Sequence, residues 1–183
     1  MMQEEPNPIK ELLFDYLKKS EKRIQELISQ SKFTEIIDDV LENCYDKVIS
    51  IGGKEGLGVL ATGLLHYLLT NALASSQRKI EYNEIQIDII IPDLKTLEIE
   101  PKKTLIICIP KIIDKTIIEQ QLEQLQKIQP VKDNIWLVIT KKLDFQNKTY
   151  VIEKKNASFS KIIYDIAQFV NIQGQNKFKI LRI

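Results

Sequence analysis

Three charged residues in this sequence have types and positions that suit phosphate or metal-ion chemistry. Asp88 lies inside the apolar, strand-like run IQIDIIIP, and Lys111 ends a second apolar run, TLIICIPK. Glu55 precedes both, in the glycine-rich segment GKEGLG. Carboxylates can hold Mg²⁺ ions that activate water, and a lysine can orient the water or stabilise developing negative charge. We expect Asp88 and Lys111 to lie on neighbouring strands.

The same residues also have a purely structural interpretation. Asp88 can point away from its apolar neighbours into solvent, because side chains alternate between the two faces of a strand. If Asp88 is buried, Lys111 can serve as its ion-pair partner, and Lys111 can equally be a solvated residue at a strand end. The sequence leaves both interpretations open.

The glycine-rich segment itself offers a second kind of site. KVISIGGKEGLG, residues 47–58, predicts a strand (VISI), a turn, and then a long helix to about Ala74. Bare amides at a helix N-terminus can bind phosphate. However, the glycine spacing differs from the dinucleotide GxGxxG pattern, and no Ser or Thr follows Lys54 as in a Walker loop. The segment is either a flexible helix entry or a nucleotide-binding turn.

Other side chains that could carry catalysis are better explained as core residues. His66 lies in an apolar stretch without Asp or Cys at ligand spacing, so we expect a core histidine. Cys44 and Cys108 sit in apolar surroundings and are expected to be reduced core thiols. Trp136 is also predicted to be buried. Neither Ser-His-Asp nor Cys-His catalysis has support in the pattern.

Two helical segments precede the main domain. Apolar residues recur at helical spacing from Pro8 to Ser31, and Thr34 is placed to cap a second helix. We expect residues 1–50 to form a helical hairpin and residues 51–183 an α/β domain, together making one structural unit. The hairpin would cover the core or provide a docking surface for a protein partner.

The rest of the chain predicts strands and helices in alternation. The expected strands are Lys79–Tyr82 and Ile85–Ile91 joined by a turn, a short edge strand in TLEIEPKK, the buried run TLIICIP, Asn134–Thr140, TYVIE, and the terminal KFKILRI. Helices are expected from Asp114 to about Gln129, with Ile117 facing inward, and from Ser158 to about Asn171. A helix between two apolar strands indicates a parallel crossover. The predicted class is α/β, with a central mixed β-sheet and flanking helices.

This order of elements, together with Asp88 and Lys111, resembles the PD-(D/E)XK nuclease superfamily, which includes restriction endonucleases and archaeal Holliday-junction resolvases. The resemblance implies an αβββαβ core over about Gly52 to Thr140. It implies that Glu55 matches the helix acid, Asp88 the strand aspartate and metal ligand, and Lys111 the catalytic lysine. The second acid of the family motif would fall at Ile109, which offers no oxygen. The resemblance therefore implies a vestigial site without a cofactor.

A literal copy of the motif lies nearby. Asp93 follows Pro92, and Glu100-Pro101-Lys102 comes shortly after. Glu100 and Lys102 flank a proline where a turn is expected, so we prefer Asp88 and Lys111 as the structural equivalents. Asp93, Glu98 and Glu100 remain alternative metal ligands.

Composition limits the partners that the chain can have. Lys and Arg number 26 against 25 Asp and Glu, a net charge of +1, so a protein that coats DNA through a general basic excess is excluded. A nucleic-acid surface would need a local patch, for which Lys102, Lys103, Lys111 and Lys115 are the candidates. The longest apolar stretch, Leu57–Leu69, is too short to span a bilayer, and no signal peptide precedes it. We expect a soluble cytoplasmic protein.

Three functions therefore stay in competition. The first, which we favour, is a degenerate nuclease-like domain that binds DNA, RNA or a protein partner as a structural subunit. The second is an active Mg²⁺-dependent nuclease that uses Glu55, Asp88 and a migrated acid. The third is a nucleotide-binding α/β domain built on the glycine turn.

Overall fold

A computed structural model describes residues 6–72 and 74–173. Its helices are α1 (Pro8–Lys19), α2 (Glu21–Ser29), α3 (Phe33–Asn71), α4 (Leu94–Ile99), α5 (Lys115–Ile128) and α6 (Ile162–Ile172). Its strands are β1 (Gln77–Tyr82), β2 (Ile85–Ile91), β3 (Leu105–Cys108), β4 (Ile135–Ile139) and β5 (Thr149–Val151). Short 3₁₀ turns are η1 (Pro101–Lys103), η2 (Lys132–Asn134) and η3 (Ser158–Lys161). The predicted α/β class with a central mixed sheet is confirmed.

The five strands form one sheet in the order β1-β2-β3-β4-β5. The β1–β2 and β2–β3 pairs are antiparallel, whereas β3–β4 and β4–β5 are parallel. Helix α5 makes the crossover from β3 to β4, as the sequence predicts. Asn83 and Glu84 form the turn between β1 and β2. Both residues have positive φ, and the turn closes the predicted hairpin.

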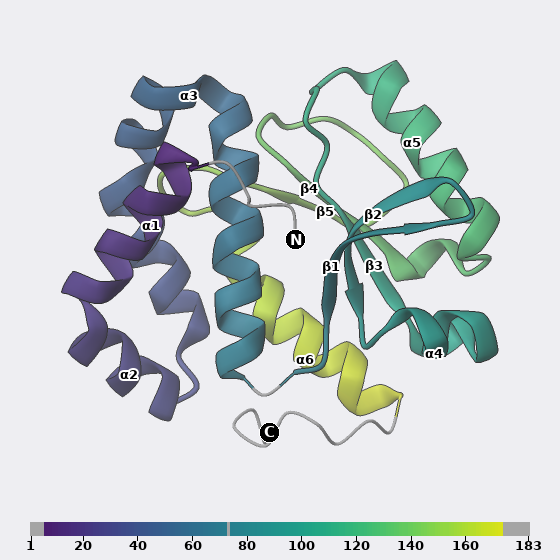
Figure 1. Ribbon diagram of the computed structural model, residues 1–183, viewed down its shortest axis with the longest axis horizontal. Helices are drawn as coiled ribbons and strands as arrows, with labels where there is room; N and C mark the ends of the chain where they lie inside the picture. The colour runs from purple at the N-terminus through teal and green to yellow at the C-terminus, as the bar shows by residue number, and fades with distance from the viewer. Residues whose placement is uncertain (1–5, 73, 174–183) are drawn as a thin grey trace.

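Helices cover both faces of the sheet (Figure 1), and each face has its own buried cluster. The α3-side cluster joins α1, α2, α3 and α6 to Ile89, Ile91, Leu105, Ile107, Ile109, Trp136, Val138, Tyr150 and Ile152. The α5-side cluster joins α4 and α5 to Ile87, Ile90, Ile106, Cys108, Ile135, Leu137 and Ile139. Because both faces are covered, β3 and β4 are apolar along their whole length.

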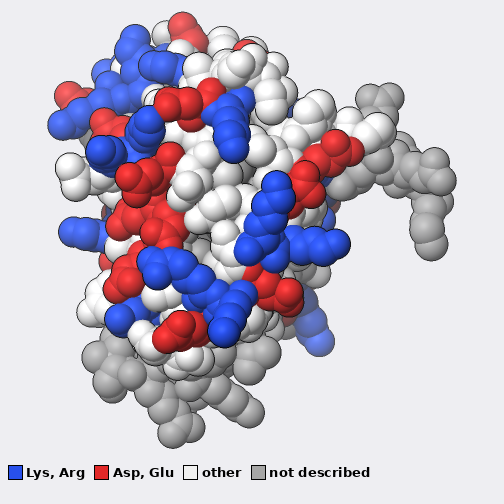
Figure 2. Space-filling view, turned by 90° about the vertical axis from the view of Figure 1, so that its left-hand side faces the viewer, with Lys and Arg blue, Asp and Glu red and all other residues white. Residues whose placement is uncertain are grey.

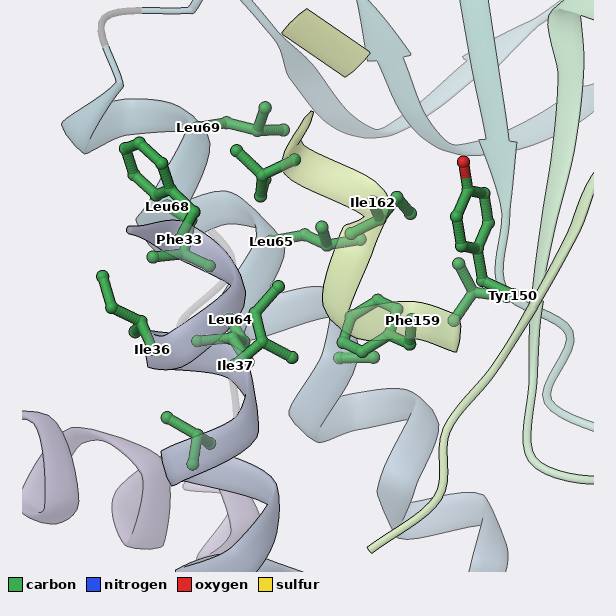
Figure 3. Close-up of a cluster of buried hydrophobic side chains, with 14 of the residues drawn as sticks. Phe33, Ile36, Ile37, Leu64, Leu65, Leu68, Leu69, Tyr150, Phe159 and Ile162 are labelled. Carbon is green, nitrogen blue, oxygen red and sulfur yellow. The ribbon is translucent and has the colours of Figure 1, made fainter. Parts of the chain in front are cut away.

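Helix α3 is bent into two arms at Gly53, whose φ of 62° and ψ of −160° lie outside the helical region. The first arm ends at Gly52 and the second begins at Lys54, and the two arms run side by side (Figure 1). Figure 3 shows Ile36 and Ile37 of the first arm near Leu64 and Leu65 of the second, with Phe159 and Ile162 against them. The predicted strand VISI is therefore wrong. The segment is the end of the first helical arm, in which Val48 is buried and Ile51 is exposed, and a short apolar run alone does not distinguish such a helix from a strand.

Glycines let α1 approach both arms of α3 closely. A Cβ atom added at Gly52 would lie 2.9 Å from Ile9 Cδ1, and one at Gly56 would lie 2.6 Å from the same atom. In this segment Gly53 thus allows the bend, and Gly52 and Gly56 allow the close contact with α1. The predicted boundary between residues 50 and 51 falls inside α3, and the α3-side cluster continues through both parts.

Four further expectations differ from the structure. The first predicted helix is two helices, which separate at Ser20, and Lys32 rather than Thr34 precedes α3. The expected edge strand TLEIEPKK is helix α4 followed by η1, because the Asp93 side chain accepts the Thr96 amide and starts a helix. Ile117 is 38% exposed rather than inward. The predicted terminal strand KFKILRI lies outside the described residues.

By length and composition, α3 is apolar enough to cross a membrane, and 39% of its most apolar window is buried inside the protein. A core helix of a soluble protein meets the same criteria. Both arms of this helix, on either side of the bend at Gly53, contribute buried residues to the α3-side cluster.

The outward face of α1, α2 and the first arm of α3 carries both signs of charge. Figure 2 shows Lys and Arg interspersed with Asp and Glu on this face, around an uncharged strip. Arg23 pairs with Asp39 at 2.8 Å and Lys154 with Asp46 at 2.5 Å. The helical face therefore presents no single-sign field to a nucleic acid.

Candidate functional site: an acid, an amide and lysines in one cleft

A cleft of about 990 Å³ opens between the second arm of α3, the β1–β2 hairpin, the segment after β3, and α5. Glu55, Asp88 and Lys111 all line it. The structure therefore brings together the three residues that the sequence selects as the helix acid, the strand acid and the lysine. The cleft lies at the carboxyl end of β3, where open α/β sheets commonly bind ligands.

Asp88 is the most constrained of the three. Its Oδ2 atom accepts a hydrogen bond of 2.7 Å from the backbone amide of Ile109 on the neighbouring segment. Burial raises the pKa of the Asp88 carboxyl, while the Ile109 amide and the charges of Lys111 and Lys79 act in the opposite direction. The two lysines therefore provide the positive charge that favours the ionised carboxylate.

Ile109 fills the position at which the family resemblance implies a second acid. Its side chain is 6% exposed and belongs to the α3-side cluster. A Cβ atom placed on Gly58 would lie 3.6 Å from Ile109 Cγ2, so the isoleucine packs directly against α3. Gly58 is one helical turn after Glu55. Ile109 thus sits between Asp88 and the helix that carries Glu55, and its hydrocarbon side chain offers no oxygen to a ligand there.

Glu55 and Lys111 are both exposed at the mouth of the cleft. Glu55 is in the first turn of the second arm of α3, which favours a negative charge there. Lys111 follows Pro110 directly after β3, where the chain leaves the sheet. Both side chains are placed to meet a ligand without rearrangement of the core.

Lys79 is a site residue that the sequence does not single out. The register pairs Arg78 with Ile89 and Ile80 with Ile87, so Lys79 stands opposite Asp88. Its φ is 50°, a left-handed conformation that a non-glycine residue adopts at a cost of about 1–3 kcal/mol. No glycine or asparagine marks this position in the sequence, so no local signal could have found it.

The strand β2 changes face beside this residue. Ile87 packs in the α5-side cluster, and Ile89 packs in the α3-side cluster, although strand residues two apart normally share a face. The change of face falls at Asp88, opposite the irregular backbone of Lys79, and Asp88 lines the cleft. Such irregularities occur often beside functional sites.

Lys10 and Arg78 also line the cleft, and the sequence analysis did not select either. Lys10 lies in the first turn of α1, which Asn7 caps by accepting the Ile9 amide at 2.9 Å. Burial lowers the pKa of the His66 imidazole, and the charge of Arg78 acts in the same direction. These two cations come from elements distant in sequence from Lys111, so only the folded arrangement places them in one site.

The alternative metal ligands lie elsewhere. Asp93 Oδ1 accepts hydrogen bonds from the Thr96 amide and hydroxyl, which commits it to the start of α4. Glu98 is exposed on α4, and Glu100 pairs with Lys103 at 2.8 Å. None of the three acids lines the cleft. Across residues 6–72 and 74–173, no group of three His, Cys, Asp or Glu side chains gathers as a metal site.

The four lysines proposed as a basic patch are not gathered on one surface. Lys102 and Lys103 lie in η1 before β3, whereas Lys111 follows the other end of that strand. Lys115 is exposed at the first position of α5 and does not line the cleft. Lys111 is thus the member of the predicted patch that belongs to the site.

Of the remaining core predictions, those for Cys44, Cys108 and Trp136 are confirmed. Cys44 and Cys108 are buried free thiols, and burial raises the pKa of both; the Asp88 charge adds to this effect at Cys108. Trp136 is 5% exposed, and its indole donates to the Asp133 carbonyl at 3.0 Å. His66 is half-buried rather than enclosed.

No protein-family model, no curated protein and no solved structure matches this chain. The fold defines an α/β protein with a mixed five-stranded sheet, and the charged cleft is its candidate site. The functional argument therefore depends on the chemistry of the residues in that cleft.

Proposed function

We propose that this protein is a catalytically degenerate nuclease-like domain that holds nucleic acid in the cleft without cleaving it. The observation that carries the proposal is the arrangement of Asp88, Ile109 and Lys111, in which an isoleucine amide binds the carboxylate beside the lysine. The element order supports it as well. The second arm of α3 is followed by β1, β2, β3, α5 and β4, which gives the αβββαβ order, with α4 inserted after β2.

The degenerate character follows from what surrounds Asp88. A hydrolytic metal site needs several oxygen ligands at once. Here the Ile109 amide donates a hydrogen bond to Asp88 Oδ2, and the Ile109 side chain fills the space toward α3. Burial also raises the pKa of Asp88, which opposes the ionised form that a metal requires. The site retains the charge pattern of a phosphate-binding centre without the ligand set for catalysis.

Nucleic acid is the ligand class that the cleft charges favour. Four cations line it, Lys10, Arg78, Lys79 and Lys111, against the acids Glu55, Glu84 and Asp88. Neutralisation of phosphates by Lys and Arg supplies most of the affinity of non-specific binding.

The direct test measures binding and cleavage together. Fluorescence anisotropy with labelled duplex DNA, single-stranded DNA and RNA should show salt-sensitive binding, and gels with Mg²⁺ or Mn²⁺ should show intact substrate. Lys111→Gln should weaken binding, whereas Lys115→Gln, outside the cleft, should leave it near wild type. Metal-dependent cleavage that is lost in Asp88→Asn would instead establish an active nuclease. Absence of binding to every nucleic acid would remove the proposal.

A gain-of-function variant tests the degenerate site specifically. Ile109→Glu restores a carboxylate between Asp88 and α3, two residues before Lys111. We expect the variant to bind Mn²⁺ in calorimetry, whereas the wild type should not. The double variant Asp88→Asn/Ile109→Glu should lose that binding. A folded Ile109→Glu protein with no metal affinity would contradict the correspondence of this position with the second acid.

A further inference from the structure

The cations of the cleft fall into two groups on either side of Asp88. Lys111 follows β3, and Lys79 belongs to β1, while Asp88 lies on β2 between these strands. Lys10 and Arg78 line the same cleft from α1 and β1. Since neighbouring strands are about 4.8 Å apart, the two groups are separated by roughly 10 Å of backbone. The two groups enter the cleft from strands on either side of Asp88, and a short stretch of nucleic-acid backbone with more than one phosphate can contact both.

The backbone of Lys79 points to a specific use of its side chain. The residue has a φ of 50° in the middle of a strand, where glycine or asparagine would be better tolerated. Its place opposite Asp88 lets its charge act on that carboxyl. Lys79 thus places a cation near the partly buried acid, and that cation lines the cleft.

The remaining lining residues show which part of a nucleic acid the cleft can contact. No aromatic side chain from the described part of the chain lines it. Proteins that bind single strands through their bases normally stack them on aromatic rings. Aliphatic residues such as Val59, Ile112 and Ile117 line the cleft instead. The available polar contacts suit phosphates, which every sequence presents alike.

We propose that Lys79, together with the cleft residues Lys10 and Arg78, forms a second phosphate-binding position that holds the same nucleic-acid strand as Lys111. The ligand is the phosphodiester backbone, bound without base sequence preference. This inference rests on the proposed function and adds to it the ligand group and the residues of β1 and α1 that bind it.

The test uses two substitutions at Lys79 and one matched control. Lys79→Asn removes the charge and suits the positive φ, because asparagine is enriched in that conformation. Lys79→Arg keeps the charge. Lys95→Asn removes one exposed lysine from α4, outside the cleft, and so matches the change in net charge. Thermal unfolding should show that Lys79→Asn is folded and at least as stable as wild type.

Binding of a labelled oligonucleotide is then measured by anisotropy over a range of salt concentrations. Loss of one charged phosphate contact should weaken binding of Lys79→Asn about tenfold at low salt. The slope of log affinity against log salt should fall by about one unit. Lys79→Arg and Lys95→Asn should stay near wild type, and oligonucleotides of different sequence should bind alike.

Two results would separate this inference from the proposed function. If wild type binds and Lys111→Gln weakens binding while Lys79→Asn behaves as Lys95→Asn, the second phosphate position is wrong and the proposed function stands. If wild type binds no oligonucleotide, both fail. Strong dependence on base sequence, or equal competition by poly-glutamate, would also overturn a backbone-directed site.

Discussion

Asp88 combines two requirements that oppose each other. Its carboxyl is buried deeply enough that desolvation raises its pKa, yet it accepts an amide hydrogen bond and faces two lysines that favour its charge. An amide donor to a carboxylate satisfies the buried oxygen but does not replace its hydration. The residue is therefore costly to the fold when ionised.

Because the pKa of Asp88 is raised in the folded protein, the stability of the protein should depend on pH. A raised folded pKa means that the native state binds the Asp88 proton more tightly than the unfolded chain does. The resulting stabilisation is fully present below the unfolded pKa and is lost as pH rises through the folded pKa. Asp88→Asn, whose amide oxygen can still accept the Ile109 amide, cannot lose stability in this way. We expect Asp88→Asn to be more stable than wild type at neutral pH.

Denaturant unfolding over a pH series checks this expectation. The advantage of Asp88→Asn should shrink as the solution is acidified toward the unfolded pKa of an aspartate. Glu98→Gln, an exposed acid on α4, should show no comparable pH-dependent gain. A lower stability of Asp88→Asn at neutral pH would mean that Lys79 and Lys111 overcompensate the burial.

The candidate site was partly predictable at the residue scale. Asp88 and Lys111 stand out because a charge in or directly after an apolar run is visible in sequence. Lys79 is not visible, because its importance comes from a positive φ in a strand and from its register opposite Asp88. Arg78 and Lys10 reach the cleft only through the hairpin and the packing of α1. Such long-range placement has no local signature.

At the scale of elements, the bend of α3 depends on one glycine. Gly53 adopts φ 62° and ψ −160°, a region that is essentially restricted to glycine. An added Cβ there meets no atom within 4 Å, so the cost of a substitution is one of backbone conformation. Gly53→Ala should lower the free energy of unfolding by about 1–3 kcal/mol.

Gly58 provides the matched substitution in the same helix. Its added Cβ would make an ordinary contact of 3.6 Å with Ile109, and it has no positive φ. Gly58→Ala should therefore stabilise the protein by up to about 1 kcal/mol through helix propensity. Chemical denaturation of both variants tests the pair. Equal effects of the two substitutions would show that the bend does not need the glycine conformation.

Elements were predictable where local and long-range signals agree. The hairpin turn at Asn83, the Asp114 cap of α5 and the apolar strand β4 all follow from local chemistry and match the structure. VISI was misassigned because its three apolar residues fit the end of a helix equally well. The Asp93 cap outweighed the strand-like appearance of TLEI. For VISI the deciding factor was tertiary packing, which the local sequence does not show. For TLEI it was the Asp93 cap, which the sequence analysis interpreted as part of a turn.

For the molecule as a whole, the question is whether the N-terminal helices are a separate unit. Buried residues of α1, including Leu13 at 1% exposure, share the α3-side cluster with Trp136 on the sheet. Hydrogen bonds from Lys154 to Asp46 and from Ser160 to Asp38 join α3 to the region after β5. These contacts predict one cooperative unfolding transition.

Leu13→Ala tests this cooperativity from a position remote from the sheet. Removing a fully buried leucine should cost about 2–5 kcal/mol, whereas Phe14→Ala, at a side chain 59% exposed, should stay within about 0.5 kcal/mol of wild type. Trp136 is the single tryptophan of the chain, so its fluorescence reports the sheet while far-UV circular dichroism reports mainly the helices. Both signals should shift together in Leu13→Ala. If circular dichroism shifted while the fluorescence transition remained at its wild-type position, the helices would unfold independently, and Lys10 could leave the cleft without loss of the sheet.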